Sequence, residues 1–197
     1  YGLDWGYSKS SQFAGTKPHL VSDFFKECAR TGMHPMLSFH PIGQSTVENF
    51  TEIKNMAKKY GILKYLTVKA PGDSASILAT SRAYEVFGNE IEGYLINVPT
   101  SETNYSGVIS RFDTLNIDKT KVKCTIEIFA KDHGTASETP ISAILAAGYI
   151  ASVAANSHSR RDGSSGDNLT ECDYEYYSEL GVTTFTTGSF CNWGLDW

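Results

Sequence analysis

The chain has 197 residues, of which 41% are hydrophobic and 20% charged, and its formal net charge is −5. This length is enough for one domain with a substantial core, and the composition is that of a globular protein. The negative charge argues against broad binding to nucleic acid or anionic membranes. No apolar run approaches the roughly 18 residues that a membrane span needs.

One pattern recurs along the chain: a segment with helical spacing ends in a glycine, and a short apolar strand follows. The first such helix is expected over residues 19–30, where Leu20, Phe24 and Cys28 lie four residues apart. Glycine is favoured just past a helix end because it adopts the left-handed conformation without a Cβ clash. The glycines in this position are Gly32, Gly61, Gly88, Gly148 and Gly181.

The alternation predicts a parallel sheet covered by helices. The six strands are expected over residues 35–40, 64–70, 92–97, 122–129, 149–156 and 182–187. An open doubly wound sheet and a (β/α) barrel both fit this order, but no GxGxxG or GxxxxGK[ST] loop supports a nucleotide-binding sheet. Six units are two short of a full barrel, which takes about 250 residues. The predicted fold class is therefore α/β, and both architectures stay open at this point.

The cysteines and the glycosylation sequons leave several points open. No CxxC pair occurs, which argues against zinc. Cys124 lies in an apolar run and is interpreted as a core residue, whereas the pairing of Cys172 with Cys191 stays open. Asn-x-Ser/Thr sequons, which matter only in a secretory route with glycosylation, occur at Asn49, Asn104 and Asn168.

A longer motif lies in residues 3–35, LDWGYSKSSQFAGTKPHLVSDFFKECARTGMHP. It resembles the glycerophosphodiester phosphodiesterase family, which often has a D-x-G-(W/Y) loop, an FAG segment and a proline before a helix, a glycine and a strand. The matching residues are Asp4, Gly6, Tyr7, Phe13, Ala14, Gly15, Pro18 and Phe24. The later segments share the family's alternating order of helices and strands. The DWGY and FAGTK segments look most like members from gut Gram-positive bacteria and their phages.

That resemblance implies a TIM barrel with a divalent metal, commonly Ca²⁺ or Mg²⁺. The family's acid–base histidines and part of its metal ligands lie on its first two strands, so residues 1–197 would form a single barrel domain lacking the first two βα units. HPMLSFHP, residues 34–41, aligns with the pattern HP-x-x-Glu-Ile-Lys-P. Ser38 then replaces a metal-binding Glu and His40 replaces a Lys.

The replacement at Ser38 argues against metal binding, because a hydroxyl is a poorer ligand for a hard cation than a carboxylate. No metal is therefore expected in a non-catalytic protein. If the protein is active, Ca²⁺ or Mg²⁺ is expected. Strand alternation puts Ser38 and His40 on the barrel-interior face. The candidate ligand-binding residues lie in the predicted strands and mostly near their carboxyl ends, where barrel sites form: Ser38, His40, Lys69, Asn97, Glu127 and Asn156.

Glu127 and His40 are the candidate catalytic residues. Ile126 and Ile128 are expected to face the helices, which leaves Glu127 inward, where a charge needs a partner such as Lys69 or His40. A structural ion pair is the alternative to catalysis. His40 and Lys69 are candidates for contact with a phosphate. The alternative for His40 is a hydrogen-bonded histidine at the barrel mouth, and the alternative for Lys69 is a side chain that reaches solvent.

Two functions follow from the resemblance. The first is a non-catalytic phosphodiesterase-like domain that binds an anionic phosphodiester or a glycan, or has a structural role, in an extracellular, cell-surface or virion assembly. The alternative is part of an active metal-dependent enzyme that hydrolyses glycerophosphodiesters or glycerol-phosphate polymers. Six strands leave two exposed edges, so a partner chain, a preceding segment or self-assembly is expected to cover them. The GLDW sequence, at residues 2–5 and again at 194–197, has no assigned meaning.

Overall fold

The computed structural model describes residues 2–4, 18–38, 45–72, 74–98, 104–130, 138–155, 158–159, 165–166 and 169–186. Contacts divide the chain into two units, and each is described by itself. Unit 1 comprises Tyr1–Ile96 and Arg111–Cys124, and unit 2 comprises Asn97–Ser110 and Thr125–Trp197. The sequence-based expectation of a single domain stays a prediction.

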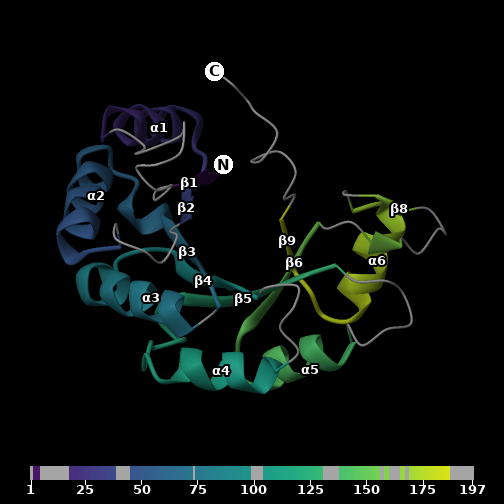
Figure 1. Ribbon diagram of the computed structural model, residues 1–197. Coiled ribbons are helices and arrows are strands. Elements are labelled where there is room, and N and C mark those ends of the chain that lie inside the picture. The colour runs from purple at the N-terminus through teal and green to yellow at the C-terminus, as the bar shows by residue number, and fades with distance from the viewer. Residues whose placement is uncertain are drawn as a thin grey trace. The chain divides into compact units, whose positions relative to one another are not determined.

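Strands and helices alternate along the chain (Figure 1). The first half contains β1 (Gly2–Asp4), α1 (Pro18–Thr31), β2 (Met36–Ser38), α2 (Val47–Lys59), η1 (Leu63–Tyr65), β3 (Thr67–Pro71), α3 (Ser74–Phe87) and β4 (Gly93–Asn97). The second half contains α4 (Tyr105–Asp113), β5 (Lys123–Phe129), α5 (Glu138–Ala146), β6 (Ile150–Ala154), β7 (His158–Ser159), β8 (Ser165–Gly166), α6 (Glu171–Glu179) and β9 (Thr184–Thr186).

The main sheet has the strand order β1-β2-β3-β4-β5-β6-β9. The pairs β1–β2, β2–β3, β5–β6 and β6–β9 are parallel, and a helix precedes each strand after the first. The chain is therefore an incomplete TIM-barrel-like α/β domain, and the predicted fold class is confirmed. All six predicted strands are present. The sequence reasoning missed β1 and the short antiparallel hairpin β7–β8, and it placed the start of β3 in what is a 3-10 turn, η1.

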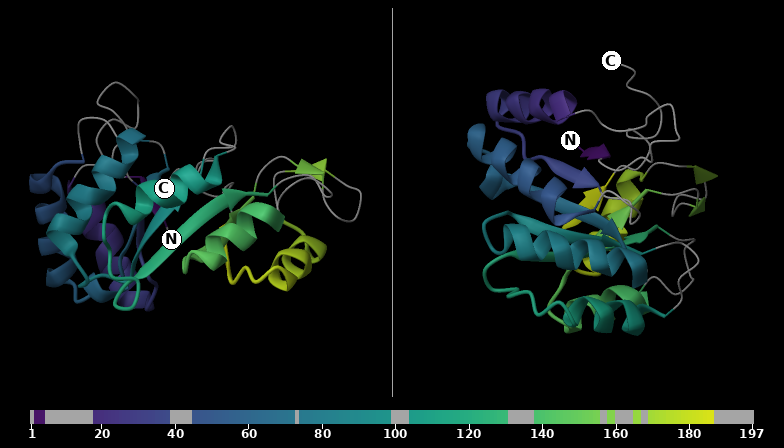
Figure 2. Two further views of the ribbon diagram at one scale, coloured as in Figure 1. Left: turned by 90° about the horizontal axis from the view of Figure 1, so that it is seen from below. Right: turned by 60° about the vertical axis from the view of Figure 1, so that its left-hand side comes forward.

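Each unit has its own buried core. In unit 1, α1, α2 and α3 lie on the same side of β1–β3 (Figures 1 and 2). Phe50 of α2 packs against Phe87 of α3 edge to face, and their ring centroids are 5.9 Å apart. Burial raises the pKa of Tyr94, whose hydroxyl donates to the carbonyl of Gly88 at 2.8 Å. In unit 2, α5 lies beside β6. Fully buried apolar residues of unit 2 include Ile126, Ile141, Ile144, Val153 and Tyr177.

The predicted helix-ending glycines have the left-handed backbone conformation, with φ between +53° and +92° at Gly32, Gly61, Gly88, Gly148 and Gly181. After Gly61, the amide of Ile62 donates to the carbonyl of Ala57 at 3.0 Å, which is the Schellman pattern that satisfies the last carbonyls of a helix. At the start of α2, the hydroxyl of Thr46 caps the helix by accepting from the amide of Asn49 at 3.2 Å.

Candidate functional site

Glu127 is a carboxylate inside a strand of buried apolar residues. It is the fifth residue of β5, its exposed fraction is 0%, and the flanking Ile126 and Ile128 are also buried. Because side chains alternate along a strand, Glu127 faces the side of the sheet opposite to these isoleucines. A carboxylate removed from water needs donors that replace its hydration, so its neighbours define the site.

Three uncharged side chains of unit 2 donate to Glu127. Asn97, the last residue of β4, donates from Nδ2 to Oε1 at 2.8 Å. The hydroxyl of Thr186, the last residue of β9, donates to Oε2, and the hydroxyl of Ser152 in β6 reaches the same oxygen over a long 3.5 Å. Both carboxylate oxygens are thus engaged. We call Asn97, Glu127, Ser152 and Thr186 the Glu127 cluster.

Asn97 and Thr186 are the last residues of β4 and β9, and (β/α) barrels place their sites at such carboxyl ends, whereas Glu127 and Ser152 lie inside β5 and β6. The four members differ in exposure: Glu127 and Ser152 are 0% exposed, whereas Asn97 and Thr186 are partly exposed. Asn97 and Thr186 are therefore the members that a ligand can reach. Glu127 accepts a hydrogen bond from each of them and so orients both.

The structure brings together two of the six candidate residues, Asn97 and Glu127. Ser38 and Lys69 are register partners on β2 and β3 of unit 1, and both are partly exposed. Asp4 of β1 occupies the register position on the other side of Ser38. The remaining two candidates, His40 and Asn156, lie outside the described residues.

Ser152 and Thr186 are the members of the cluster that the sequence reasoning missed. Each is a hydroxyl residue in a predicted apolar strand, IASVA and TFT. A buried carboxylate on β5 needs donors from its neighbours, so polar residues with inward parity on the adjacent strands were the available signal. Serine and threonine are common in strands for packing reasons, which hid that signal.

The metal and thiol chemistry of the described residues is limited. No three His, Cys, Asp or Glu side chains among them are placed to hold a metal ion together. Cys28 and Cys124 are buried free thiols, and Cys172 is a partly exposed one. Burial raises the pKa of Cys124 to about 11 and also raises that of Cys28. In the same described part, no helix has both the length and the apolar character to cross a membrane.

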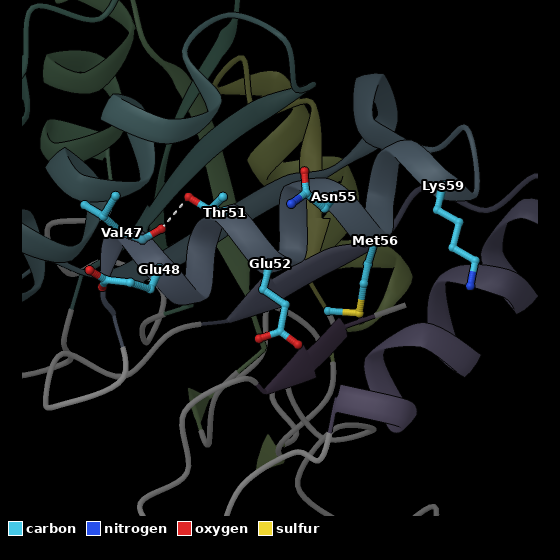
Figure 3. A pocket seen from close by; sticks show the side chains of 7 residues that line it. All are labelled: Val47, Glu48, Thr51, Glu52, Asn55, Met56 and Lys59. Atoms are coloured by element: carbon cyan, nitrogen blue, oxygen red, sulfur yellow. Dashed lines mark hydrogen bonds between the residues drawn. The ribbon is translucent and has the colours of Figure 1, made fainter.

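A shallow hollow of about 600 Å³ runs along α2 in unit 1 (Figure 3). Its lining residues are Val47, Glu48, Thr51, Glu52, Asn55, Met56 and Lys59. They come from one helix, none of them is buried, and Thr51 donates its hydroxyl back to the carbonyl of Val47 at 2.7 Å. This surface has the character of a solvated helix face, in contrast to the buried carboxylate of the Glu127 cluster.

Solved structures of β-mannanases are similar to this chain. A β-mannanase from Streptomyces thermolilacinus matches with a TM-score of 0.59 and 12% identity, over 94% of this chain and 68% of that one. A β-mannanase from Thermomonospora fusca, solved with mannohexaose, matches with a TM-score of 0.55 and 14% identity, over 94% of this chain and 67% of that one. No protein-family model and no curated protein matches the chain.

These matches concern the fold: the chain resembles β-mannanases in its incomplete TIM-barrel-like architecture. At such low identity the likeness concerns the fold alone. The resemblance to the glycerophosphodiester phosphodiesterase family is wrong, since the similar structures are β-mannanases. The helix–glycine–strand rhythm behind that resemblance is common to (β/α) barrels, and most of the loop match, including Gly6, Tyr7 and Phe13, lies outside the described residues.

Proposed function

We propose that this chain is a barrel domain that binds an uncharged, polyhydroxylated, glycan-like ligand at the Glu127 cluster without cleaving it. The observation that carries the proposal is the state of Glu127, whose exposed fraction is 0% and whose two oxygens both accept hydrogen bonds from within unit 2. A carboxylate that attacks or protonates a substrate must reach the reacting atoms. Glu127 instead supports two side chains that can touch a ligand.

The acidic residues of the described part also favour binding over cleavage. Glycoside hydrolysis in most families uses two carboxyl groups, about 5–5.5 Å or about 6.5–9.5 Å apart. Among the acidic side chains that the structure describes, the buried ones are Glu127 and Asp173. Asp173 caps α6 by accepting from the amide and hydroxyl of Thr170, each at 2.8 Å. It therefore has a structural role as part of the cap of α6.

A glycan is the ligand class that these side chains suit. Amide and hydroxyl groups at a partly exposed strand end match the hydroxyl groups of a sugar. One of the similar solved structures is a mannohexaose complex, which makes mannohexaose a sensible first probe. An extracellular, cell-surface or virion location, and the covering of the sheet edges by a partner chain or a second copy, remain predictions.

The second candidate is hydrolysis of a glycan, and the likeness to β-mannanases is the observation that favours it. In that case Glu127 would be one carboxylate of a pair, and the second would come from outside the described residues. The expectation of Ca²⁺ or Mg²⁺ in an active protein was implied by the phosphodiesterase resemblance, and hydrolysis by a pair of carboxyl groups requires no metal.

One experiment separates the two candidates. The protein is incubated with mannohexaose while binding is followed by calorimetry and the products by chromatography, with and without EDTA. Binding with intact mannohexaose after prolonged incubation supports the proposed function. Shorter oligosaccharides from the wild type, but not from Glu127→Gln, overturn it in favour of hydrolysis. Absence of both binding and cleavage rejects both candidates for this glycan.

A further inference from the structure

We infer that Thr186 and Asn97 set the specificity of the Glu127 cluster for uncharged hydrogen-bond donors and exclude anionic groups. This inference rests on the proposed function and names the property by which the ligand is selected. It depends on the direction of the hydrogen bonds that Asn97 and Thr186 make to Glu127.

Thr186 presents only acceptor capacity to a ligand. A carboxylate can only accept, so the single hydroxyl hydrogen of Thr186 is used in its bond to Glu127 Oε2. The lone pairs of Oγ1 stay available, and the residue is partly exposed. A ligand atom that approaches Thr186 must therefore bring a hydrogen of its own.

Asn97 is oriented by the same carboxylate. Its Nδ2 donates to Glu127 Oε1 at 2.8 Å, which fixes the amide so that Oδ1 lies at the opposite end of the group. Within the part of the chain that the structure describes, no hydrogen bond to this Oδ1 is seen. Asn97 thus offers one acceptor and one remaining N–H, and together with Thr186 the exposed atoms of the cluster are mostly acceptors.

The acceptor pattern also selects against anions. An ionised phosphate or carboxylate oxygen brings no hydrogen and meets the acceptor atoms of Thr186 and Asn97, whereas a sugar hydroxyl donates its hydrogen to them. We expect discrimination against an anion of at least about tenfold in Kd. Glu127 is in this account a positioning residue, and Thr186 and Asn97 are the residues that touch the ligand.

The first arm of the test needs no ligand. Hydrogen exchange of the asparagine side-chain amides is followed by NMR, with the exposed Asn55 of α2 as internal reference. The Asn97 amide is expected to exchange at least about tenfold more slowly than that of Asn55, because one hydrogen is held by Glu127. Equal exchange of the two amides overturns the donor assignment, whatever the ligand is.

The second arm measures binding of mannohexaose and inorganic phosphate to the wild type, Thr186→Val, Thr186→Ser and the exposed control Thr183→Val. We expect the wild type to prefer mannohexaose, Thr186→Val to weaken it by about fivefold or more, and the other two variants to stay within about twofold. Phosphate bound as tightly as mannohexaose, or equal effects of Thr186→Val and Thr183→Val, overturns the inference.

Glu127→Gln gives a readout that a merely structural role does not produce. Its Oε1 still accepts from Asn97, but its Nε2 donates to Thr186, whose hydroxyl hydrogen then turns toward the ligand. The preference for mannohexaose over phosphate is expected to fall, because Thr186 can then donate a hydrogen bond to an anion. An unchanged preference contradicts the inference. If the wild type binds no mannohexaose, the proposed function fails, and the amide exchange of Asn97 still decides the donor assignment.

Discussion

The hydroxyl of Thr186 on β9 donates to Oε2 of Glu127 on β5, although β6 lies between these strands. The register explains this reach. Glu127 lies beside Ser152 and Ser152 lies beside Thr184, so Thr186 is two residues farther along β9 and on the same face. Side chains from three strands converge on one carboxylate in unit 2. That convergence makes Glu127 the centre of a site instead of an isolated buried charge.

Replacing Thr186 with valine should destabilise the fold as well as weaken binding. The change keeps the side-chain shape and leaves a buried carboxylate oxygen short of a donor, which costs about 1–3 kcal/mol of unfolding free energy. Thr183→Val, at an exposed position on the same segment, is expected to change it by less than about 0.5 kcal/mol. Urea unfolding of the two variants measures the difference. Equal stabilities would contradict the hydrogen bond.

Replacing Asn97 with aspartate places a second carboxylate where Nδ2 now lies 2.8 Å from Glu127 Oε1. Two carboxylates in one site raise the pKa of the pair, so the folded state binds a proton more readily than the unfolded state. The loss of unfolding free energy caused by Asn97→Asp is then largest at neutral pH. It shrinks as the pH falls toward about 4, the usual pKa range of Asp and Glu. Urea midpoints at several pH values test this, with the exposed Asn55→Asp as control. A penalty independent of pH would contradict the contact.

The positions of the strands and of the helix ends could be predicted because they depend on local rules. Glycines with positive φ follow five helices at the positions where apolar periodicity stops, as at Gly61 and Gly148. The edge strand β1 could not be predicted, because three residues carry too little periodicity and its pairing with β2 is non-local. The choice of a barrel-like sheet over an open one rested on the family resemblance, because local patterns do not determine which strands are neighbours.

Half of the Glu127 cluster could be predicted, and the reason lies in sequence contrast. Glu127 stands out as a charge among buried isoleucines, and Asn97 as a polar end to an apolar strand. Ser152 and Thr186 do not stand out, and a contact between residues 59 positions apart follows from register alone. The family assignment failed for a related reason, since short loop motifs and a shared barrel rhythm do not distinguish one barrel family from another.

Gly93 is required by the closeness of β4 to Lys123 in unit 1. A Cβ at this position would lie 2.8 Å from the carbonyl oxygen of Lys123, and that atom belongs to the backbone. Gly93→Ala is expected to cost about 1–3 kcal/mol from overpacking. Gly61→Ala, where a Cβ meets nothing within 4 Å but φ is +70°, should cost about 1–2 kcal/mol from backbone strain alone. Thermal unfolding compares them, and a neutral Gly93→Ala would contradict the packing.

The three described thiols should differ in reactivity. The thiolate is the reactive form, so a pKa of about 11 leaves Cys124 about a hundredfold less thiolate at pH 8 than an ordinary pKa of 9.0. Iodoacetamide under native conditions is expected to label the partly exposed Cys172 and to spare Cys28 and Cys124 until denaturant is added. Peptide mapping by mass spectrometry gives each rate. Rapid native labelling of Cys124 would contradict its burial.

The central claim is that an intact glycan lies against Asn97 and Thr186 at the carboxyl end of these strands. A high-resolution crystal structure of the protein soaked with mannohexaose measures this most directly. We predict sugar hydroxyls at hydrogen-bond distance, about 2.7–3.0 Å, from Asn97 Oδ1 and Thr186 Oγ1, with every glycosidic bond unbroken and Glu127 not in contact with the sugar. A cleaved sugar, one bonded directly to Glu127, or one bound only elsewhere would contradict the account.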